Sequence, residues 1–220
     1  MRRAAFIPIK TISTRLEGKN FRILGGLPLY QHVINHALQA DCFDEVFVDT
    51  DSDEIADFAV DSGAVFIERD PHLATDDANG NDLIVRHAEQ YPEFDHIFQL
   101  FATSPFLQPG TIRQCVEALG VRTEHDSIFT VSRVAGWFWF QGQPVNFRPG
   151  ILPRSQDANT LTKETCGLYG LRRETILKYR CRIGANPIEW VVGDRECLDI
   201  DNIFDLEAAQ QAIEGVTHGA

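Results

Sequence analysis

Residues that could handle a polyphosphate lie in two distant segments of opposite charge. The first is residues 10–22, which carry four cations and one anion in a chain whose formal net charge is −12. This run directly follows a strand-like segment, so its backbone amides and the cations Lys10, Arg15 and Lys19 are expected to face a crevice. Amides and fixed cations together offset the repelling charges of a triphosphate. The alternative is a solvated basic loop.

The second segment is the acidic run around residue 200. Asp199 and Asp201 are separated by one residue, so on an extended backbone both carboxylates point to the same side. Two such carboxylates repel unless a cation lies between them, and Mg²⁺ with phosphate oxygens suits that arrangement. Taken alone, this spacing is common; it gains meaning only beside the basic loop. Asp205 is expected to cap the final helix or to be exposed.

Strand-like and helical segments alternate along most of the chain. We expect strands at residues 4–9, 45–49, 64–68, 96–101 and 127–133, and helices at 28–40, 79–91 and 111–119. A further helix should begin after the N-cap Ser52 and end at Gly63. This alternation predicts an α/β fold with a doubly wound, mostly parallel sheet of Rossmann-like type. The ligand site should then lie beyond the carboxyl ends of the strands.

The pattern changes between residues 137 and 163. Trp137 to Phe140, a glycine-containing turn and Pro144 to Phe147 favour a β-hairpin with exposed aromatic side chains, inserted into the α/β order as an arm. An exposed aromatic patch usually marks an interface, so we expect a homodimer in which this arm contacts the partner.

The composition bounds the remaining possibilities. A length of 220 residues fits a single domain spanning 1–220, and no apolar run is long enough to span a bilayer. The basic start Met1-Arg2-Arg3 leads into a strand with no cleavage site, so we expect no signal peptide and a cytoplasmic location. The acidic charge argues against nucleic acid as a partner. Five widely spaced cysteines form neither a CxxC pair nor a zinc pattern and should be reduced thiols.

The basic loop lacks both common glycine-rich phosphate motifs, because a Walker loop would need Gly at Ser13 and Ser or Thr at Asn20. Instead, Ile7-Pro8-x-Lys10 followed by Lys19-Asn20 resembles the I-P-A-R … K-N signature of the CMP-sialic acid synthetases. The intervening S-T-R-L-x-G-K run is more similar to the loop of Kdo cytidylyltransferases. The resemblance implies that Lys10, Arg15 and Lys19 grip the phosphates of CTP. It also assigns further residues to the nucleotide: Ile7, Pro8, Ser13 and Asn20.

Three further motifs extend this resemblance over nearly the whole chain. The run from Arg69 to Gly80 is similar to the family's R-P-x-x-L-A-x-D-x-A segment, which places Arg69, Ala78 and Gly80 at the cytosine and ribose. Read without the family, it is a loop before a helix capped by Asp76 or Asp77. The L-D-I-D-N-I-F-D-L run looks like the family's D-I-D-T-x-x-D-L, which implies that the metal ligands are Asp199 and Asp201.

The third motif lies on the acceptor side, where the chain departs from the family. L-F-A-T-S-P-F resembles L-Q-P-T-S-P-L, with Phe101 in place of the glutamine and with Thr103 and Ser104 able to meet a ligand. The stretch P-R-S-Q at 153–156, then Gly167-Leu168-Tyr169, resembles P-R-Q-Q … R-P-N-G-A-I-Y. The family's arginine corresponds roughly to Lys163, and its asparagine to Cys166. The implied acceptor-binding residues are therefore Phe101, Thr103, Ser104, Lys163 and Tyr169.

The resemblance implies a cytidylyltransferase that uses Mg²⁺ and transfers CMP from CTP to a small acidic acceptor, with release of pyrophosphate. Overall similarity favours a sialic-acid-like ulosonic acid as acceptor. The altered residues favour a smaller phosphonate, because lost hydrogen-bond partners discriminate strongly against a polyol. One or two of Arg172, Arg173, Arg180 and Arg182 could bind the acceptor's anionic group. Other classes remain open: a non-catalytic nucleotide-binding regulatory protein, or a glycosyltransferase.

Overall fold

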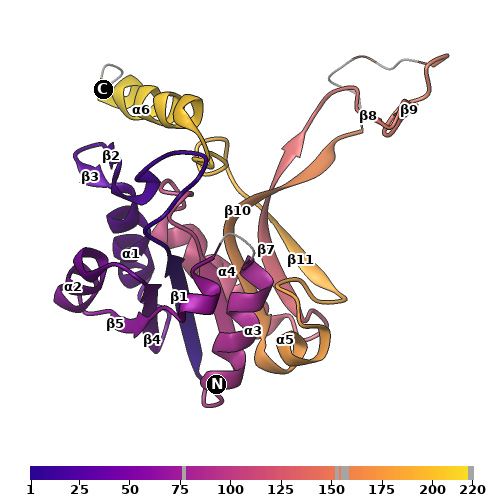
Figure 1. Ribbon diagram of the computed structural model, residues 1–220. Coiled ribbons are helices and arrows are strands. Elements are labelled where there is room, and N and C mark those ends of the chain that lie inside the picture. Colours follow the sequence, from indigo (N-terminus) through magenta and orange to yellow (C-terminus); the bar gives the residue numbers. More distant parts are fainter. Residues whose placement is uncertain (76–77, 152–153, 155–158, 218–220) are drawn as a thin grey trace.

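The alternating strands and helices build a seven-stranded sheet with helices on both faces (Figure 1). The computed structural model describes residues 1–75, 78–151, 154 and 159–217. The strand order is β11-β7-β10-β6-β1-β4-β5, and β10 runs antiparallel to both of its neighbours while the other pairs are parallel. The predicted mostly parallel, doubly wound fold is confirmed. The strands are β1 (Arg3–Ile9), β4 (Glu45–Thr50), β5 (Val65–Glu68), β6 (His96–Leu100), β7 (Ser127–Val134), β10 (Leu161–Arg172) and β11 (Pro187–Val191).

The helices divide between the two faces of the sheet. On one face lie α1 (Leu29–Gln39), α2 (Asp53–Asp61) and α4 (Pro109–Val121). On the other lie α3 (Gly80–Gln90) and α5 (Arg173–Tyr179). The predicted elements are confirmed with ends shifted by a residue or two. Within the described part of the chain, no helix has both the length and the apolar character that a membrane span requires.

Two helix starts show how local chemistry sets the boundaries. Ser52 caps α2 as predicted, its hydroxyl accepting from the Ile55 amide. At α3 the cap is Asn79, which forms a capping box with Asp82. Asp76 and Asp77, named as alternative caps, lie outside the described residues, and the cap they were expected to provide is supplied by Asn79.

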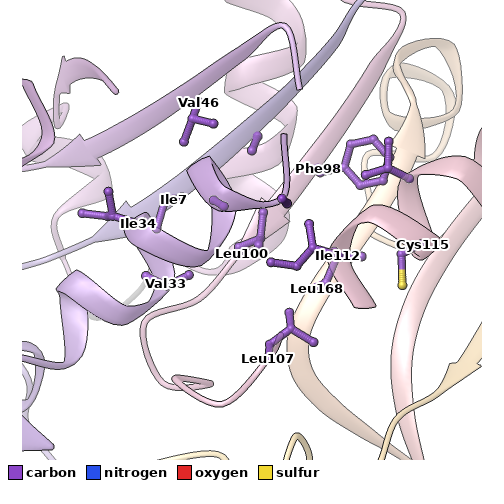
Figure 2. Close-up of a cluster of buried hydrophobic side chains, with 14 of the residues drawn as sticks. Ile7, Val33, Ile34, Val46, Phe98, Leu100, Leu107, Ile112, Cys115 and Leu168 are labelled. Atoms are coloured by element: carbon purple, nitrogen blue, oxygen red, sulfur yellow. The ribbon is translucent and has the colours of Figure 1, made fainter. Parts of the chain in front are cut away.

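The larger core cluster fills the space between the sheet and α1, α2 and α4 (Figure 2). Ile7 of β1, Val33 and Ile34 of α1, and Ile112 of α4 all contribute fully or almost fully buried side chains to it. Burial of such apolar surface contributes about 25 cal/mol per Å². This packing fixes the direction of β1 and therefore the place where the basic loop leaves the sheet.

The predicted hairpin is present, with shorter strands than the sequence suggested. β8 (Trp139–Phe140) pairs with β9 (Gln143–Pro144), and the segment projects from the ends of β7 and β10, away from the body (Figure 1). Asn146 braces it: its amide donates to the carbonyls of Gly136 and Asn159, and its oxygen accepts from Phe138 N. The Trp139 and Phe140 side chains are exposed, at 59% and 67%.

The last segment of the chain returns to the first loop. The helix α6 (Ile203–Thr217) packs beside the short strands β2 (Ile23–Leu24) and β3 (Leu27–Pro28) through a small apolar cluster that includes Leu24 and Leu206. Asn202 and Asp205 form a capping arrangement at its start: Asp205 accepts from the amides of Asp201 and Asn202. The predicted capping role of Asp205 is thus observed. Two short 3-10 turns, η1 (Lys19–Phe21) and η2 (Pro71–Leu73), complete the elements.

Candidate active site

A pocket of about 510 Å³ opens beyond the carboxyl ends of β1, β5 and β6, where the fold predicts a ligand site. It is built from six segments that are distant in sequence: the loop after β1, the segment from the end of β5 into α3, the turn after β6, Cys166 in β10, Arg182 after α5, and the residues before α6. Most of the predicted site residues line it. They are Pro8, Lys10, Ser13, Arg15, Lys19, Asn20, Arg69, Ala78, Gly80, Phe101, Thr103, Asp199 and Asp201.

The basic loop is closed on itself by Asn20. Its side-chain amide donates to the Lys10 carbonyl at 2.8 Å, which ties the end of the loop to its beginning. Lys19 and Asn20 are both buried in η1, whereas the Arg15 side chain is 66% exposed. Asn20 therefore has a structural reason to be present, in addition to lining the pocket. The loop therefore has a fixed, buried end at Lys19 and Asn20 and an exposed cation, Arg15, at the edge of the pocket.

The two halves of the predicted polyphosphate site meet at Asp201. Arg15 Nη1 lies 2.6 Å from Asp201 Oδ2, and Lys19 Nζ lies 3.1 Å from Asp201 Oδ1. The acidic segment is fixed in place by a hydrogen bond from Ile200 N to the Thr103 carbonyl at 2.8 Å. Both segments are thus brought to one point, although 186 residues separate Arg15 from Asp201.

Asp199 is the more buried of the two carboxylates. Burial and the neighbouring charge of Asp201 raise its pKa, against the lowering effects of a hydrogen bond from Thr103 and the charge of Lys19. Its Oδ1 is buried without a hydrogen-bond partner among the described residues. An unpartnered buried carboxylate oxygen is costly in a protein and is therefore commonly satisfied by a ligand or an ion.

The donor set fits Mg²⁺. This ion usually takes one or two protein carboxylates and completes its shell with water and substrate phosphates. Asp199 offers the unpartnered oxygen and Asp201 a second carboxylate beside it. Within the described residues no cluster of three or more acidic, His or Cys side chains could hold a metal.

On the opposite wall, Arg69 is held by a buried ion-pair network. Its Nε donates to Asp49 Oδ1 and its Nη2 to the Asp49 carbonyl at 2.8 Å. His87 Nε2 lies 2.8 Å from Asp49 Oδ2, so the ring must carry its proton there, because a carboxylate only accepts. The side chains of Arg69, Asp49 and His87 are only 2%, 5% and 1% exposed.

The charges within this network are fixed by burial and by each other. Burial lowers the pKa of His87 in spite of the nearby Asp49 carboxylate, which keeps the ring neutral. Burial would raise the pKa of Asp49, but the hydrogen bond from His87 and the charge of Arg69 outweigh it, so this pKa lies below its usual value. Arg69 consequently lines the pocket as a cation, and its partner Asp49 is buried outside the pocket lining.

The predicted acceptor-side residues divide into two groups. Phe101 and Thr103 line the pocket, as does Cys166. Ser104 is buried, with its hydroxyl on the Thr165 carbonyl, and Tyr169 is fully buried, with its hydroxyl donating to Glu164 at 2.5 Å. The structure does not bring Ser104 or Tyr169 to the pocket surface, because both are buried; the Tyr169 ring lies behind the lining residues Phe101 and Arg182.

Two other predicted positions also lie away from the described pocket wall. Lys163 is exposed on β10 opposite Ser132, near the root of the arm. Ile7 is fully buried in the core cluster of Figure 2. Successive residues of a strand point to opposite faces of the sheet, so Ile7 and its neighbour Pro8 cannot face the same side. Pro8 lines the pocket instead. Of the P-R-S-Q stretch, Pro153, Ser155 and Gln156 lie outside the described residues.

Sequence reasoning missed several lining residues, including Asn79 and Leu83 of the α3 region and Ala102 after β6. It also did not separate Arg182 from three neighbouring arginines, although Arg182 alone of the four lines the described pocket. Arg182 follows a short helix with no recognisable motif. What distinguishes Arg182 is its contact with the rings of Phe101 and Tyr169, and that contact exists only in the folded chain. No sequence signal could therefore have identified it.

The pocket and the sheet order together define a doubly wound α/β protein with a ligand-sized pocket at the carboxyl ends of its strands, and comparison identifies its family. A model described as cytidylyltransferase matches residues 4–191. The chain belongs to the cytidylyltransferase family. The resemblance expected from its motifs is therefore confirmed.

Several curated relatives share this sequence pattern. N-acylneuraminate cytidylyltransferase A of Danio rerio is 30% identical over 203 residues, covering 89% of this chain and 47% of that protein. CMP-N,N'-diacetyllegionaminic acid synthase of Legionella pneumophila is 45% identical over 122 residues, covering 53% of each chain. The 3-deoxy-manno-octulosonate cytidylyltransferase of Myxococcus xanthus is 27% identical over 224 residues, covering 96% of this chain and 85% of that protein. The chain spans about half the length of the first two relatives.

The fold also has solved counterparts. A CMP:2-keto-3-deoxy-manno-octonic acid synthetase complexed with CTP aligns with a TM-score of 0.73 and 19% identity, covering 98% of this chain and 100% of that one. A 4-diphosphocytidyl-2C-methyl-D-erythritol synthase from Anaerococcus prevotii aligns with a TM-score of 0.68 and 11% identity, covering 97% and 98%. At these identities the likeness establishes the fold.

Proposed function

We propose that this chain transfers CMP from CTP to a carboxylated sugar of the ulosonic acid class, with release of pyrophosphate. The observation that carries the proposal is the meeting of Arg15 and Lys19 with Asp201 in one pocket. A polyphosphate needs the cations and a metal ion needs the carboxylates, and a nucleotidyl transfer needs both at one point. The names of the relatives, which refer to acylneuraminate, legionaminic acid and deoxy-octulosonate, support the acceptor class.

In the proposed reaction an acceptor hydroxyl oxygen attacks the α-phosphorus of CTP in line. The new P–O bond forms as the bond between the α-phosphorus and the α–β bridging oxygen breaks. The hydroxyl proton passes to solvent water, and pyrophosphate leaves. Lys10, Arg15 and Lys19 neutralise the charge that develops on the pyrophosphate. Asp199 and Asp201 are the residues that would hold Mg²⁺, which would supply Lewis-acid stabilisation of the phosphate charge. Positioning and electrostatics carry such a reaction, and no covalent nucleophile is required.

CTP competes with Asp201 for the same two cations. Arg15 and Lys19 each have a carboxylate oxygen of Asp201 as partner, and a triphosphate offers them stronger, more highly charged acceptors. Arg15 is 66% exposed, so its move away from Asp201 meets little packing resistance. Binding of the triphosphate would thereby release both carboxylate oxygens of Asp201 from their cation partners.

The test is pyrophosphate release from CTP and Mg²⁺ across a panel of ulosonic acids and phosphonates. Release with an ulosonic acid supports the proposal. CTP binding with no pyrophosphate from any acceptor would indicate a non-catalytic nucleotide-binding protein, and free nucleoside diphosphate would indicate a glycosyltransferase. Either result overturns the proposed reaction.

A phosphonate is the second candidate acceptor. The observation that favours it is the pocket wall formed by Phe101 and Cys166, which stand where the family pattern has a glutamine and an asparagine. Two amides are thereby replaced by an aromatic ring and a thiol, which leaves fewer hydrogen-bond partners for a polyol. Turnover of a small phosphonate in preference to every ulosonic acid in the same panel would select this candidate.

We also propose a homodimer whose interface includes the projecting arm, and a cytoplasmic location. The exposed Trp139 and Phe140 support the first, because apolar surface of this kind on a projecting hairpin gains from a partner. The five free cysteines support the second, since a reducing compartment keeps thiols unpaired. Sedimentation as a monomer at micromolar concentration would contradict the dimer.

A further inference from the structure

Four arginines follow one another closely between residues 172 and 182, and the structure gives them different partners. Arg172 and Arg173 donate to main-chain carbonyls. Arg180 pairs with Glu89 on the surface at 2.9 Å. Arg182 is the one of the four that lines the described pocket. Any role in ligand binding at this pocket therefore falls to Arg182.

Arg182 reaches the pocket on a fixed backbone. Its main-chain amide donates to the Asn81 side chain in α3 at 2.9 Å. Its guanidinium lies 4.1 Å from the centre of the Tyr169 ring and 5.9 Å from that of Phe101. A cation held over the face of an aromatic ring is attracted by the ring itself and not through its N–H groups. The contact with Tyr169 therefore holds the guanidinium in place without using its hydrogen-bond donors.

The carboxylate nearest to Arg182 is engaged elsewhere. Glu164 Oε2 lies 3.8 Å from Arg182 Nη2, too far for a hydrogen bond, and accepts the Tyr169 hydroxyl at 2.5 Å. Among the residues that the structure describes, the guanidinium has no hydrogen-bond acceptor within reach. The Arg182 side chain is 27% exposed, so it is partly desolvated with its donors unused.

Room for the guanidinium comes from Gly80, the first residue of α3. A Cβ atom built on Gly80 would lie 2.8 Å from Arg182 Nη1, closer than such contacts allow. The same Cβ would lie 3.3 Å from Gln99 Oε1, a fully buried oxygen that has no partner among the described residues. The missing side chain at position 80 therefore keeps a space in which Arg182 and an unsatisfied acceptor both lie.

The proposed reaction centre and Arg182 belong to the same pocket. Asp199, Asp201, Cys166, Phe101 and Arg182 all line it. A ligand bound in this pocket can therefore meet both the proposed metal site and the Arg182 guanidinium.

From this geometry we propose that Arg182 binds the anionic oxygens of the acceptor, as the fork of a two-point ion pair. The inference rests on the proposed cytidylyltransferase function and names the group that the acceptor must carry. A planar guanidinium matches two oxygens of a carboxylate or a phosphonate equally well. The first would belong to an ulosonic acid and the second to a small phosphonate.

The test compares Arg182→Gln and Arg182→Lys with Arg180→Gln, a nearby surface arginine outside the pocket. With the acceptor found in the panel, Arg182→Gln should raise the acceptor KM roughly 10- to 100-fold, as loss of a charge-assisted hydrogen bond predicts. Arg182→Lys should recover part of this loss, because it keeps the charge but not the fork. CTP affinity, measured directly by calorimetry, should change less than about twofold in all three variants, and the acceptor KM of Arg180→Gln should stay at the wild-type value.

A second arm separates the two sources of the anion. If the acceptor is an ulosonic acid, its neutral carboxamide should be penalised in the wild type but not further in Arg182→Gln, because both changes remove the same contact. If only phosphonates are turned over, their monomethyl esters replace the carboxamide, because a neutral diester would also lose the oxygen that attacks CTP. An unchanged acceptor KM in Arg182→Gln, or an equal loss of CTP affinity, would overturn the assignment while leaving the proposed reaction intact. A wild-type protein that binds CTP and releases no pyrophosphate with any acceptor overturns both.

Discussion

Two arginines face the same pocket, and they are held in opposite ways. Arg69, on the side that we assign to the nucleotide, is 2% exposed and bonded to a buried carboxylate that is itself bonded to a buried histidine. Arg182, on the acceptor side, lies on aromatic rings at 27% exposure, with a long contact to a partly exposed glutamate. The nucleotide side is fixed before any ligand arrives, whereas the acceptor side keeps unused hydrogen-bonding capacity.

The two arrangements differ in their energetic cost and in how readily they accept a substitution. A buried ion pair costs several kcal/mol of desolvation, and it repays that cost only when its geometry is kept. The partly exposed Arg182 guanidinium keeps some of its hydration, so its desolvation costs less and substitution of its neighbours should destabilise the fold less. Substitutions on the two sides should therefore differ in both the size and the kind of their effects.

The largest effect is expected where the two sides meet. Asp201→Asn removes a carboxylate from the proposed metal site and should lower kcat for pyrophosphate release by roughly 100- to 1,000-fold, comparable to the loss of a main electrostatic contact to the transition state. Metal-free CTP binding should not weaken, because Asp201 no longer competes for Arg15 and Lys19. Steady-state kinetics and calorimetry measure the two quantities. Asp57→Asn, on the surface of α2, is the matched control, and full Mg²⁺-dependent activity in Asp201→Asn would refute the metal assignment.

The next effect concerns stability and contrasts the two sides directly. Asp49→Asn leaves Arg69 buried without a countercharge and should lower the free energy of unfolding by about 3 kcal/mol or more. Glu164→Gln, on the acceptor side, changes a 42% exposed carboxylate and should cost less than about 1 kcal/mol. Urea unfolding of both variants at neutral pH gives the comparison. Equal costs would mean that the acceptor side is as rigidly built as the nucleotide side.

A smaller effect should appear on acidification. The folded pKa of His87 lies below its ordinary value of about 6.5, so the unfolded chain binds more protons between the two values, and stability falls as the pH drops through about 6.5. Between pH 7 and 5 this single site should contribute up to about 2 kcal/mol of the loss. His96, whose pKa burial lowers to about 4, acts in the same direction.

His87→Asn should therefore flatten the pH dependence of the unfolding free energy without removing it, while the surface variant His72→Asn leaves the slope unchanged. Chemical unfolding at half-unit pH steps measures the slope. A slope in His87→Asn identical to that of the wild type would show that His87 is not held neutral by its burial.

The smallest effect is expected at Cys166. Its φ angle of 58° places a residue other than glycine in the left-handed region, within the irregular part of β10. Asparagine adopts this conformation more readily, so Cys166→Asn should raise the free energy of unfolding by up to about 1 kcal/mol. Thermal unfolding measures the change. A loss of stability would mean that the thiol contact with the Tyr169 hydroxyl, at 3.6 Å, outweighs the backbone strain.

The parts of this molecule that could be predicted from sequence are those governed by local patterns. The strand and helix order followed from hydrophobic periodicity, and Ser52 and Asp205 could be recognised as caps because capping depends on residues three or four apart. The nucleotide half of the pocket also followed from contiguous motifs, since Lys10, Lys19 and Asp201 each stand in a recognisable run.

The missing parts depend on contacts between distant segments. Nothing near Arg69 in sequence identifies Asp49 and His87 as its support, because β4 and α3 bring them together only in the folded chain. Tyr169 and Ile7 stood in matching motifs yet face the core, since a motif match does not say which side of a strand a residue occupies. Arg182 was one of four similar candidates until the fold placed it.

The hydrogen bonds that join the first loop to the last segment can form only late in synthesis of the chain. A ribosome adds about 5–20 residues per second, so Arg15 waits roughly 10 to 40 seconds for Asp201, 186 residues later. Throughout that interval the nascent chain has Lys10, Arg15 and Lys19 but neither proposed metal ligand. The pocket is therefore completed only when the last segment has been made and has folded back onto the first loop.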